Sequence, residues 1–318
     1  MTADITATVL LISGSYLLGA LPSAYLLARV VRGIDIREYG SGNVGISNFS
    51  VHVGNLWAVP VVLFDIFIKG MLPVVLASDK VLGLGTGVEA GAGIASILGH
   101  NWSVWLKFTG GRGMATVLGV VAPLHYPLVV LYGGQAGMAW LGARGRRNPM
   151  YVAAGLAMIA VFCFVLAEDP FGSGEHGKPL WAVVPAGTFL LALLVTYAVI
   201  SGVPRLQARA KDSALWWGLA ALMLPVWSAI FQQPWQVTVF SGVFLSVTAF
   251  KRLRSNRGTG TGAEERVPLL RLVWNRLVFD RDIDERRAWV HRSPEEERDS
   301  SGAGGQPPAT PRKDGAPA

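Results

Sequence analysis

Two glycine-rich segments of the sequence carry side chains and backbone groups that are suited to binding phosphate. The first segment, residues 35–48, interleaves glycines with the small polar residues Ser41, Gly42, Asn43 and Asn48. A loop of this composition turns tightly and can direct several backbone N–H groups toward one anion. Most such loops are simply turns, so the first segment alone is a weak signal.

The second segment, residues 99–116, leads into an apolar stretch that is typical of a helix. The N-terminus of that helix offers unpaired N–H groups and a positive dipole end to an anion. Arg112 adds a permanent charge that can bind phosphate through two N–H groups. The alternative for Lys107 and Arg112 is that they only anchor a cytoplasmic loop. The candidate phosphate-binding residues of this segment are Lys107, Gly110, Gly111, Arg112, Gly113 and Thr116.

A histidine and a basic cluster complete the set of candidates. His100 could act as a general acid or base, although a single histidine at the edge of an apolar stretch is more often structural. The basic cluster, residues 251–256, contains Arg252, Arg254 and Asn256. On its own, such a cluster marks the end of a membrane span. We find no Ser-His-Asp constellation, and no metal or organic cofactor is expected.

Composition places these segments in a membrane protein. The chain has 318 residues, of which 51% are apolar and only 15% are charged, whereas a soluble domain is about one-quarter charged. The net charge of +7 does not indicate a nucleic-acid binder, because basic residues in such a chain mark cytoplasmic loops. The single cysteine, Cys163, excludes a disulfide within the chain.

The apolar stretches predict an all-α, polytopic transmembrane helix bundle of about nine spans, because roughly 20 apolar residues cross a bilayer. Basic loops alternate with loops that are almost free of basic residues, which places the N-terminus outside and the C-terminus in the cytoplasm. Both glycine-rich segments and the basic cluster then lie on the cytoplasmic side. The predicted spans cover residues 5–28, 54–78, 84–100, 113–127, 128–143, 150–167, 180–200, 213–231 and 234–250.

The composition of the chain changes after the last predicted span. Residues 1–256 form the predicted membrane domain, and residues 257–318 form a cytoplasmic tail. Apolar residues at helical spacing predict a helix over 266–280, which would lie on the inner leaflet or be a weak cytoplasmic helix. The rest of the tail is polar and rich in Gly and Pro, which predicts disorder.

Together, the three segments resemble the PlsY family, the acyl-phosphate-dependent glycerol-3-phosphate acyltransferases of bacteria. The family's first motif, approximately G-S-G-N-[IV]-G-A-T-N-x-x-R, matches from Gly40 to Asn48. Its second motif, G-H-x-x-P-x-x-x-x-F-x-G-G-K-G-x-A-T, resembles the whole second segment, with Arg112 at the lysine position. Its third motif contains R-H-R-x-N and resembles residues 252–256. Shorter matches are Gly19–Pro22, Asp65 and Lys69-Gly70.

This resemblance implies transfer of a fatty acyl group from acyl phosphate to the sn-1 hydroxyl of glycerol 3-phosphate, which gives lysophosphatidate for phospholipid synthesis. It implies a multi-pass protein of the bacterial inner membrane with a core of about seven spans, to which two helices are added here. The implied partners are acyl phosphate, glycerol 3-phosphate and membrane lipid, with the oligomeric state left open. The implied catalytic residues are His100 and Asn256, and the implied substrate-binding residues are Ser41, Gly42, Asn43, Asn48, Lys107, Gly110, Gly111, Arg112, Gly113, Thr116, Arg252 and Arg254.

Four positions depart from the family pattern. Val51 stands where the first motif ends in arginine, and Ser103 stands at the proline of the second motif. Leu253 replaces the histidine of the third motif, and Ala153 replaces a serine that follows a later span. The alternative function is therefore that of an inactive family member that binds lipid or phosphate.

Two further expectations concern polar groups near the predicted spans. Asp65 and Lys69 lie four residues apart, so they can form an ion pair on one helix face, where we expect them to position the second span. His52 or His100 could replace the missing histidine of the third motif as a base.

Overall fold

The computed structural model describes residues 2–124, 213–230, 233–254 and 268–279. Within these ranges all regular elements are helical, and the one β-type pairing is an isolated bridge between Ser103 and Thr109. The predicted all-α class is therefore confirmed for the described part of the chain.

The first apolar stretch forms two helices where the sequence predicts one. Helix α1 covers Thr2–Ala20 and α2 covers Ser23–Arg32. Pro22 separates them, since a proline lacks an N–H group and disfavours the helical conformation of the residue before it. The helix expected over 5–28 is thus corrected to two helices joined by a short break, and that break becomes part of the pocket described below.

A small hydrophobic core packs the first segment against α2. The 3₁₀ turn η1 (Ile36–Glu38) and helix α3 (Ile46–His52) lie on either side of the glycines. Leu106 of the second segment belongs to the same core, so both glycine-rich segments are packed side by side. The buried members of this core are Ala24, Ala28, Ile36, Val44, Phe49, Val53, Ala58, Val61 and Leu106.

The carboxylate of Asp35 fixes the start of the first segment. It accepts hydrogen bonds from Nε and Nη2 of Arg37 at 2.9 and 2.7 Å, and from the backbone N–H of Arg37 at 3.1 Å. The hydrogen bonds from Arg37 hold the pKa of the Asp35 carboxyl below its usual value, although partial burial opposes that shift.

We therefore expect Asp35→Asn to lower the free energy of unfolding at pH 7 by about 1–2 kcal/mol. A carboxyl whose pKa is lowered by folding stabilises the protein above its unfolded pKa of about 4, and this contribution disappears as the pH falls through the folded pKa. Thermal unfolding in detergent from pH 3 to 8 should show the wild-type and variant curves converging in acid. The exposed Asp79, changed to Asn, is the control. A pH-independent difference would contradict this role of Asp35.

The second predicted span is one continuous helical stretch with a π-helical centre. Helix α4 (Asn55–Leu63), the π segment η2 (Phe64–Met71) and α5 (Leu72–Ala77) follow one another without a break. Their combined range agrees with the stretch predicted at 54–78. The π segment buries Asp65 and Lys69, and such local widening of a helix is frequent at functional sites.

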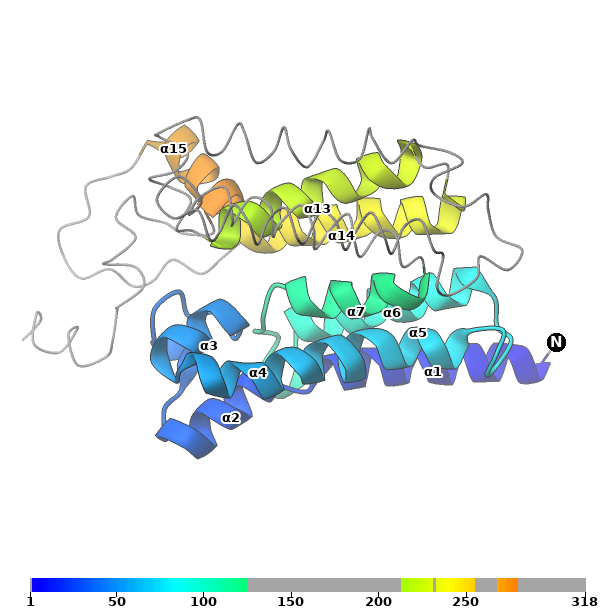
Figure 1. Cartoon of the computed structure of the whole chain (residues 1–318), viewed down its shortest axis with the longest axis horizontal. Coiled ribbons are helices and arrows are strands. Elements are labelled where there is room, and N and C mark those ends of the chain that lie inside the picture. Colours follow the sequence, from blue (N-terminus) through cyan, green and yellow to red (C-terminus); the bar gives the residue numbers. More distant parts are fainter. Residues whose placement is uncertain (1, 125–212, 231–232, 255–267, 280–318) are drawn as a thin grey trace, which may run out of the picture.

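The other described helices of the bundle agree with predicted stretches, and Figure 1 shows the long helices roughly parallel to one another. They are α6 (Thr86–Asn101), α7 (Met114–Leu124), α13 (Ser213–Ile230) and α14 (Trp235–Leu253). The 3₁₀ turn η3 (Val104–Leu106) lies in the loop between α6 and α7, outside the predicted spans. The spans predicted at 128–143, 150–167 and 180–200, as well as Ala153, Cys163 and Asn256, lie outside the described residues.

Helix α6 lies at the centre of the described bundle, where it contacts α1, α5, α7 and α14. Glycines bring α1 and α6 into close contact. A Cβ atom added to Gly19 would lie 2.1 Å from the carbonyl oxygen of Ser96, and one added to Gly99 would lie 2.1 Å from that of Tyr16. This close approach places the break after α1 beside the end of α6.

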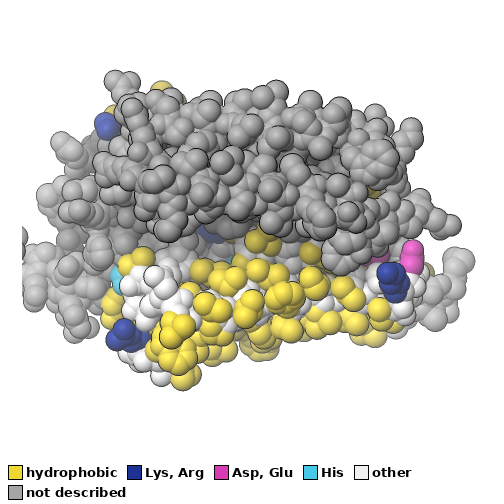
Figure 2. Space-filling view, viewed as in Figure 1, with side chains coloured by type: hydrophobic (Ala, Val, Ile, Leu, Met, Phe, Trp, Pro, Cys, Tyr) yellow, Lys and Arg dark blue, Asp and Glu magenta, His cyan; other side chains and the backbone are white. Residues whose placement is uncertain are grey.

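Two helical stretches of the described residues, Ile5–Arg32 and Asn55–Ala77, are long and apolar enough to cross a membrane. Figure 2 shows a nearly continuous apolar surface in the lower half of the view, where Figure 1 draws α4 and α5. Large apolar side chains of α4 and α1 are exposed, such as Leu56 of α4, which is 81% exposed, and Leu10 of α1, which is 67% exposed. An apolar surface of this extent is typical of a protein surrounded by lipid.

The tail contributes a short helical segment that packs on the ends of α13 and α14. It consists of α15 (Leu269–Trp274) and the π turn η4 (Asn275–Phe279). Nη1 of Arg252 donates to the carbonyl oxygen of Leu277 at 2.5 Å. In return, Nη1 of Arg276 donates to that of Leu253 at 2.7 Å. These reciprocal bonds attach the segment to the end of α14.

Candidate functional site

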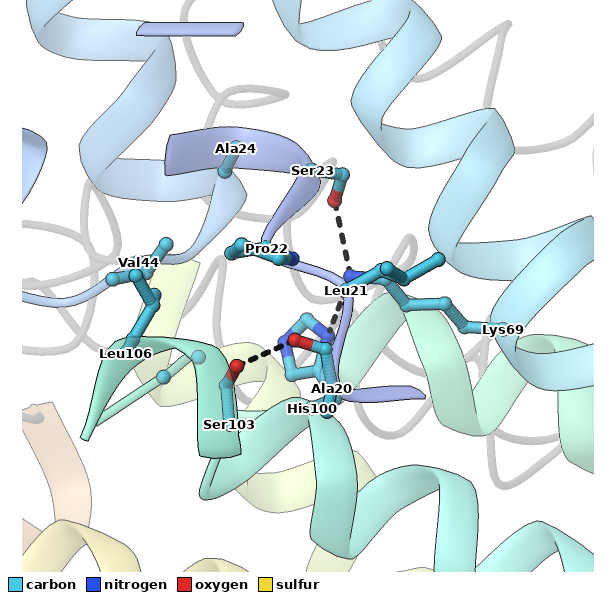
Figure 3. Close-up of a pocket in the computed structure, with 12 residues that line it drawn as sticks. Ala20, Leu21, Pro22, Ser23, Ala24, Val44, Lys69, His100, Ser103 and Leu106 are labelled. Atoms are coloured by element: carbon cyan, nitrogen blue, oxygen red, sulfur yellow. Dashed lines mark hydrogen bonds between the residues drawn. The ribbon is translucent and has the colours of Figure 1, made fainter. Parts of the chain in front are cut away.

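A pocket lies where the break between α1 and α2 meets the end of α6 (Figure 3). The space within it that is open to a water-sized sphere is about 10 Å³, which is room for about one water molecule. Four parts of the chain line it: the break itself, the first segment, η2 and the second segment. Its lining includes the side chains of Ser23, Lys69, His100 and Ser103 and the backbone of Gly110 and Gly111.

A buried ion pair holds Lys69 at one side of this pocket. Nζ of Lys69 lies 2.7 Å from Oδ1 of Asp65, and each side chain is at most 3% exposed. The hydroxyl of Ser23 donates to the same oxygen at 2.9 Å and accepts from Nζ at 3.0 Å. A buried pair is costly unless further hydrogen bonds satisfy its groups, and Ser23 supplies them. The pair predicted from sequence is present, and its lysine also lines the pocket, which the spacing of the two residues did not indicate.

His100 connects this ion pair to the second segment. Its Nδ1 lies 3.5 Å from Nζ of Lys69 and 3.3 Å from Oγ1 of Thr116. On the opposite edge of the ring, a Cβ atom added to Gly111 would lie 2.1 Å from Nε2. The absence of a side chain at Gly111 therefore makes room for the imidazole. Of the predicted residues, His100, Gly111 and Thr116 are brought into direct contact.

The loop between α6 and α7 is held in a compact turn by Ser103. Its N–H donates to the carbonyl oxygen of Thr109 at 3.0 Å, and its own carbonyl accepts from the N–H of Phe108 at 2.8 Å. Its hydroxyl donates to the carbonyl oxygen of Ala20 at 2.5 Å. The residue that departs from the family's proline thus ties the second segment to the end of α1.

The glycine-rich end of the second segment leads directly into α7. The N–H of Gly111 donates to the carbonyl oxygen of His100 at 3.0 Å. Gly113 has a φ of 71°, a conformation that favours glycine. Arg112, between these glycines, is only 8% exposed. The N–H of Gly111 is thus used inside the loop, and the first N–H groups of α7 follow directly after Gly113, at the place where the sequence predicts an anion site.

Asn101 is a candidate residue that sequence reasoning did not identify. It is completely buried, and neither its Oδ1 nor its Nδ2 has a hydrogen-bond partner among the described residues. A Cβ atom added to Gly113 would lie 3.3 Å from Oδ1. Because buried polar groups are normally hydrogen-bonded, an amide in this place is suited to bind a ligand at the glycine loop. Nothing in the local sequence distinguishes it from a buried structural asparagine.

Asn48 organises the first segment from within. Its Nδ2 group lies within hydrogen-bond distance of the carbonyl oxygens of Ile36, Tyr39 and Asn43, at 3.0, 2.9 and 3.1 Å. Its Oδ1 accepts from the N–H of Ser41 at 3.3 Å. These bonds are internal to the loop, so Asn48 shapes the segment, and the sequence could not show that its polar groups are already used.

The rest of the first segment stands near the pocket without lining it. The hydroxyl of Ser41 accepts from the N–H of Asn43 at 3.4 Å, and Gly42, with a φ of 65°, is exposed. Val44 is the one residue of this segment among those that line the pocket. The ring of His52 packs on Tyr39 with centroids 5.4 Å apart. Of the two histidines considered as bases, His100 is therefore the one that lines the pocket.

The remaining predicted residues surround the pocket at a distance or serve other contacts. Lys107 is exposed and has a φ of 53°, and Arg254 is exposed beside the ring of Phe250. Arg252 is buried against the tail segment. The basic cluster reaches the second segment through Lys251, which donates to the carbonyl oxygen of Asn101.

Comparisons with known proteins show which family this sequence is similar to. The family model described as glycerol-3-phosphate acyltransferase matches residues 9–209. A glycerol-3-phosphate acyltransferase of Gloeobacter violaceus is 38% identical over 160 residues, which are 50% of this chain and 76% of that protein. One from Thermus thermophilus is 37% identical over 202 residues, which are 64% of this chain and 92% of that protein.

Among solved structures, the chain is similar to PlsY (YgiH), an integral membrane glycerol 3-phosphate acyltransferase, in its glycerol 3-phosphate form. The TM-score is 0.47 at 23% identity, and the match covers 77% of this chain and 88% of the other. The match of the family model to more than half of the sequence, together with the Gloeobacter violaceus and Thermus thermophilus relatives, identifies the protein as an acyltransferase. The chain belongs to the glycerol-3-phosphate acyltransferase family.

Proposed function

We propose that this protein transfers a fatty acyl group from acyl phosphate to the sn-1 hydroxyl of glycerol 3-phosphate and so forms lysophosphatidate. The observation that carries this proposal is the pocket itself. In a chain of this family, it combines a buried lysine, a histidine and a glycine loop at a helix N-terminus. These are the groups that a phosphate-containing substrate requires.

The reaction requires no covalent intermediate between the substrate and the protein. The hydroxyl oxygen attacks the acyl carbonyl carbon, an ester bond forms, and the bond between that carbon and the phosphate oxygen breaks. By atom balance, the hydroxyl proton ends on the released phosphate. The acyl donor is already activated, so positioning the substrates and stabilising the leaving phosphate can supply most of the acceleration.

We assign the predicted residues to these tasks as follows. Gly110, Gly111, Arg112 and Gly113 form the phosphate cradle, and His100 faces it. The first segment contributes Val44 to the pocket, and the internal bonds of Asn48 maintain its shape around Ser41 and Asn43, which we assign to substrate binding.

The predicted basic residues outside the pocket have a second task. Lys107 and Arg254 are exposed, so they can attract the anionic substrates before binding. Asn256 is retained as a proposed catalytic residue, and Arg252 as a residue that supports the end of α14.

We further propose a multi-pass protein of the bacterial inner membrane with about nine spans, its N-terminus outside and its pocket on the cytoplasmic side. The two long apolar helical stretches and the exposed apolar surface support this location. The tail, residues 257–318, would then be cytoplasmic. The exposed apolar residues of α15, Leu269, Leu270 and Trp274, would lie against the inner leaflet.

The test is an assay of the purified protein in detergent with acyl phosphate and glycerol 3-phosphate. We expect phosphate release that depends on glycerol 3-phosphate and is matched by lysophosphatidate. Arg112→Ala should lower turnover by about 10²–10³-fold, as loss of a donor to developing charge does, whereas Arg32→Ala, at an exposed arginine of α2, should not. No release, with the Gloeobacter violaceus relative active in parallel, would reject the proposal in favour of an inactive phosphate- or lipid-binding member.

A further inference from the structure

We propose that the loop between α6 and α7 inserts aromatic side chains into the headgroup region of the cytoplasmic leaflet, beside the pocket. This loop, residues 102–109, is named the aromatic loop, and its partner is a phospholipid surface. The proposal rests on the membrane location and the acyl transfer proposed above, because a long-chain acyl phosphate dissolves in the bilayer and must reach the pocket from there.

The inner side of the aromatic loop is fixed to the rest of the protein. Leu106 is buried in the hydrophobic core that packs the first segment against α2. The carbonyl oxygen of Ser103 accepts hydrogen bonds from the N–H groups of Leu106 and Phe108, at 3.1 and 2.8 Å. The hydroxyl of Ser103 donates to the carbonyl oxygen of Ala20 at 2.5 Å. The loop is therefore held close to the ends of α1 and α6 in one orientation.

The outer side of the loop is apolar and exposed. Trp105 is 59% exposed and Phe108 is 62% exposed, and Val104 beside them is exposed as well. Lys107, which lies between the two aromatic residues in the sequence, is also exposed. Tryptophan is enriched where a protein crosses the membrane surface, and lysine is attracted to the phosphates of anionic lipids there. This combination of residues therefore fits the headgroup region better than it fits water or the bilayer centre.

The backbone conformation supports the same assignment. Lys107 and Phe108 have φ angles of 53° and 59°, and within the described part of the chain they are the two non-glycine residues with a positive φ. This conformation is disfavoured for residues that carry a Cβ atom, and it persists where surrounding contacts determine it. The contacts here are the hydrogen bond from Phe108 to Ser103 and one from the hydroxyl of Thr109 to the carbonyl oxygen of Leu106, at 2.7 Å. The turn keeps Leu106 inside, while the two residues that follow it face outward.

Aromatic residues at the end of α14 continue this surface. Trp102, at the start of the loop, packs near the exposed Phe250 of α14, with ring centroids 6.1 Å apart. Nζ of Lys251 lies 5.0 Å from the ring centroid of Trp102, and Cζ of Arg254 lies 5.9 Å from that of Phe250. Aromatic rings beside cations at the ends of apolar helices are typical of a membrane–water interface. Since α6 and α14 are in contact and both agree with predicted spans, the loop lies at the depth at which these spans leave the bilayer.

The pocket lies on the inner side of the same loop. Ser103 and Leu106 line it, as Figure 3 shows. The pocket has room for about one water molecule, so a long acyl chain is not enclosed there. In this arrangement the chain of the acyl donor stays in the bilayer, and the aromatic loop keeps the pocket at the membrane surface, where the phosphate end of the donor lies.

The direct test is spin labelling of the full chain in vesicles of phosphatidylethanolamine and phosphatidylglycerol. In a Cys163→Ala background, a single cysteine is introduced as Trp105→Cys, as Phe108→Cys or, for a water-exposed control in η1, as Glu38→Cys. We expect labels at positions 105 and 108 to be reached by oxygen and protected from a water-soluble nickel complex, and the label at position 38 to show the reverse.

Two results of this labelling would overturn the proposal. Access of the nickel complex at positions 105 and 108 equal to that at position 38 would place the loop in water. Protection from both oxygen and the nickel complex would indicate that a second copy of the chain, and not lipid, covers the loop. The measurement needs no turnover, so it decides the question even if the proposed acyl transfer is absent.

Kinetics in the same vesicles provide a second readout. The double variant Trp105→Ser/Phe108→Asn removes both rings, and asparagine tolerates a positive φ better than most residues. Both side chains are exposed, so thermal unfolding should change little. We expect the KM for a long-chain acyl phosphate to rise about tenfold, as loss of one buried aromatic contact would cause, while kcat and the KM for glycerol 3-phosphate stay the same. A water-soluble, short-chain acyl phosphate should be used equally well by both proteins, and equal losses with both donors would contradict the proposal.

The matched control for the double variant lies at the other end of α6. Val81 and Leu82 are large apolar residues, also exposed, in the loop that precedes this helix. We expect Val81→Ser/Leu82→Ser to keep the wild-type KM for both acyl donors. A rise in KM equal to that of the aromatic-loop variant would show that any loss of exposed apolar surface has this effect, and it would contradict a specific role of the aromatic loop.

Discussion

Gly111→Ala is expected to abolish acyl transfer while leaving the protein folded. The added Cβ would lie 2.1 Å from Nε2 of His100, well inside van der Waals contact, so the imidazole must leave its place. Gly111 does not have a positive φ, so the loss would come from this contact and not from backbone strain. We expect kcat to fall by at least about 10²–10³-fold, the loss typical of removing a group that stabilises developing charge.

The measurement is phosphate release in detergent, together with a thermal unfolding curve. Gly242→Ala on α14 is the matched control, since its added Cβ would meet nothing within 4 Å. A Gly111→Ala protein with wild-type kcat/KM would show that His100 does not occupy this position during turnover.

Gly119→Ala is expected to have the largest effect on stability. Its Cβ would lie 1.9 Å from the carbonyl oxygen of Ile66, where α7 crosses η2. Gly70 makes the reciprocal contact, since its Cβ would lie 2.3 Å from the carbonyl oxygen of Thr116. The two helices must separate to accept a methyl group. We expect the free energy of unfolding to fall by about 2–3 kcal/mol, near the upper range for overpacking a close contact.

Separation of α7 from η2 should also change the contacts of His100 in the pocket, because Thr116 and Lys69 approach His100 from these two helices. Thermal unfolding in detergent measures the stability, and kcat/KM measures the pocket. Gly14→Ala on α1, with nothing within 4 Å of the added Cβ, is the control. An unchanged melting temperature would mean that α7 and η2 are not packed this closely.

Most of the described fold could be predicted from the sequence, because the length of an apolar run and its bounding residues are local properties. The stretches at 54–78 and 234–250 are helices for this reason. The break after α1 was missed although its signal was present, since Pro22 restricts both itself and the residue before it. The length of an apolar run therefore predicts a single helix only where no proline interrupts the run.

The candidate site was predictable to a smaller extent. Glycines around Arg112 indicated a phosphate cradle, because a glycine-rich turn before a helix can present backbone N–H groups to an anion. Asn48 was expected to face a ligand, but its polar groups are used inside the first segment. Which way an amide points is decided by the carbonyl groups that folding brings within reach, and these are not visible in a linear motif.

Composition and residue spacing alone indicate the class of molecule: an apolar chain, helical throughout its described part, with two glycine-rich segments of recognisable spacing. The tertiary structure decided which polar groups meet. Ser23 and Asp65, 42 residues apart, and Lys69 and His100, 31 residues apart, converge because glycines let α1, α6, η2 and α7 approach closely. Helix formation depends on neighbours along the chain, whereas a buried ion pair and the contacts of a buried histidine depend on neighbours in space.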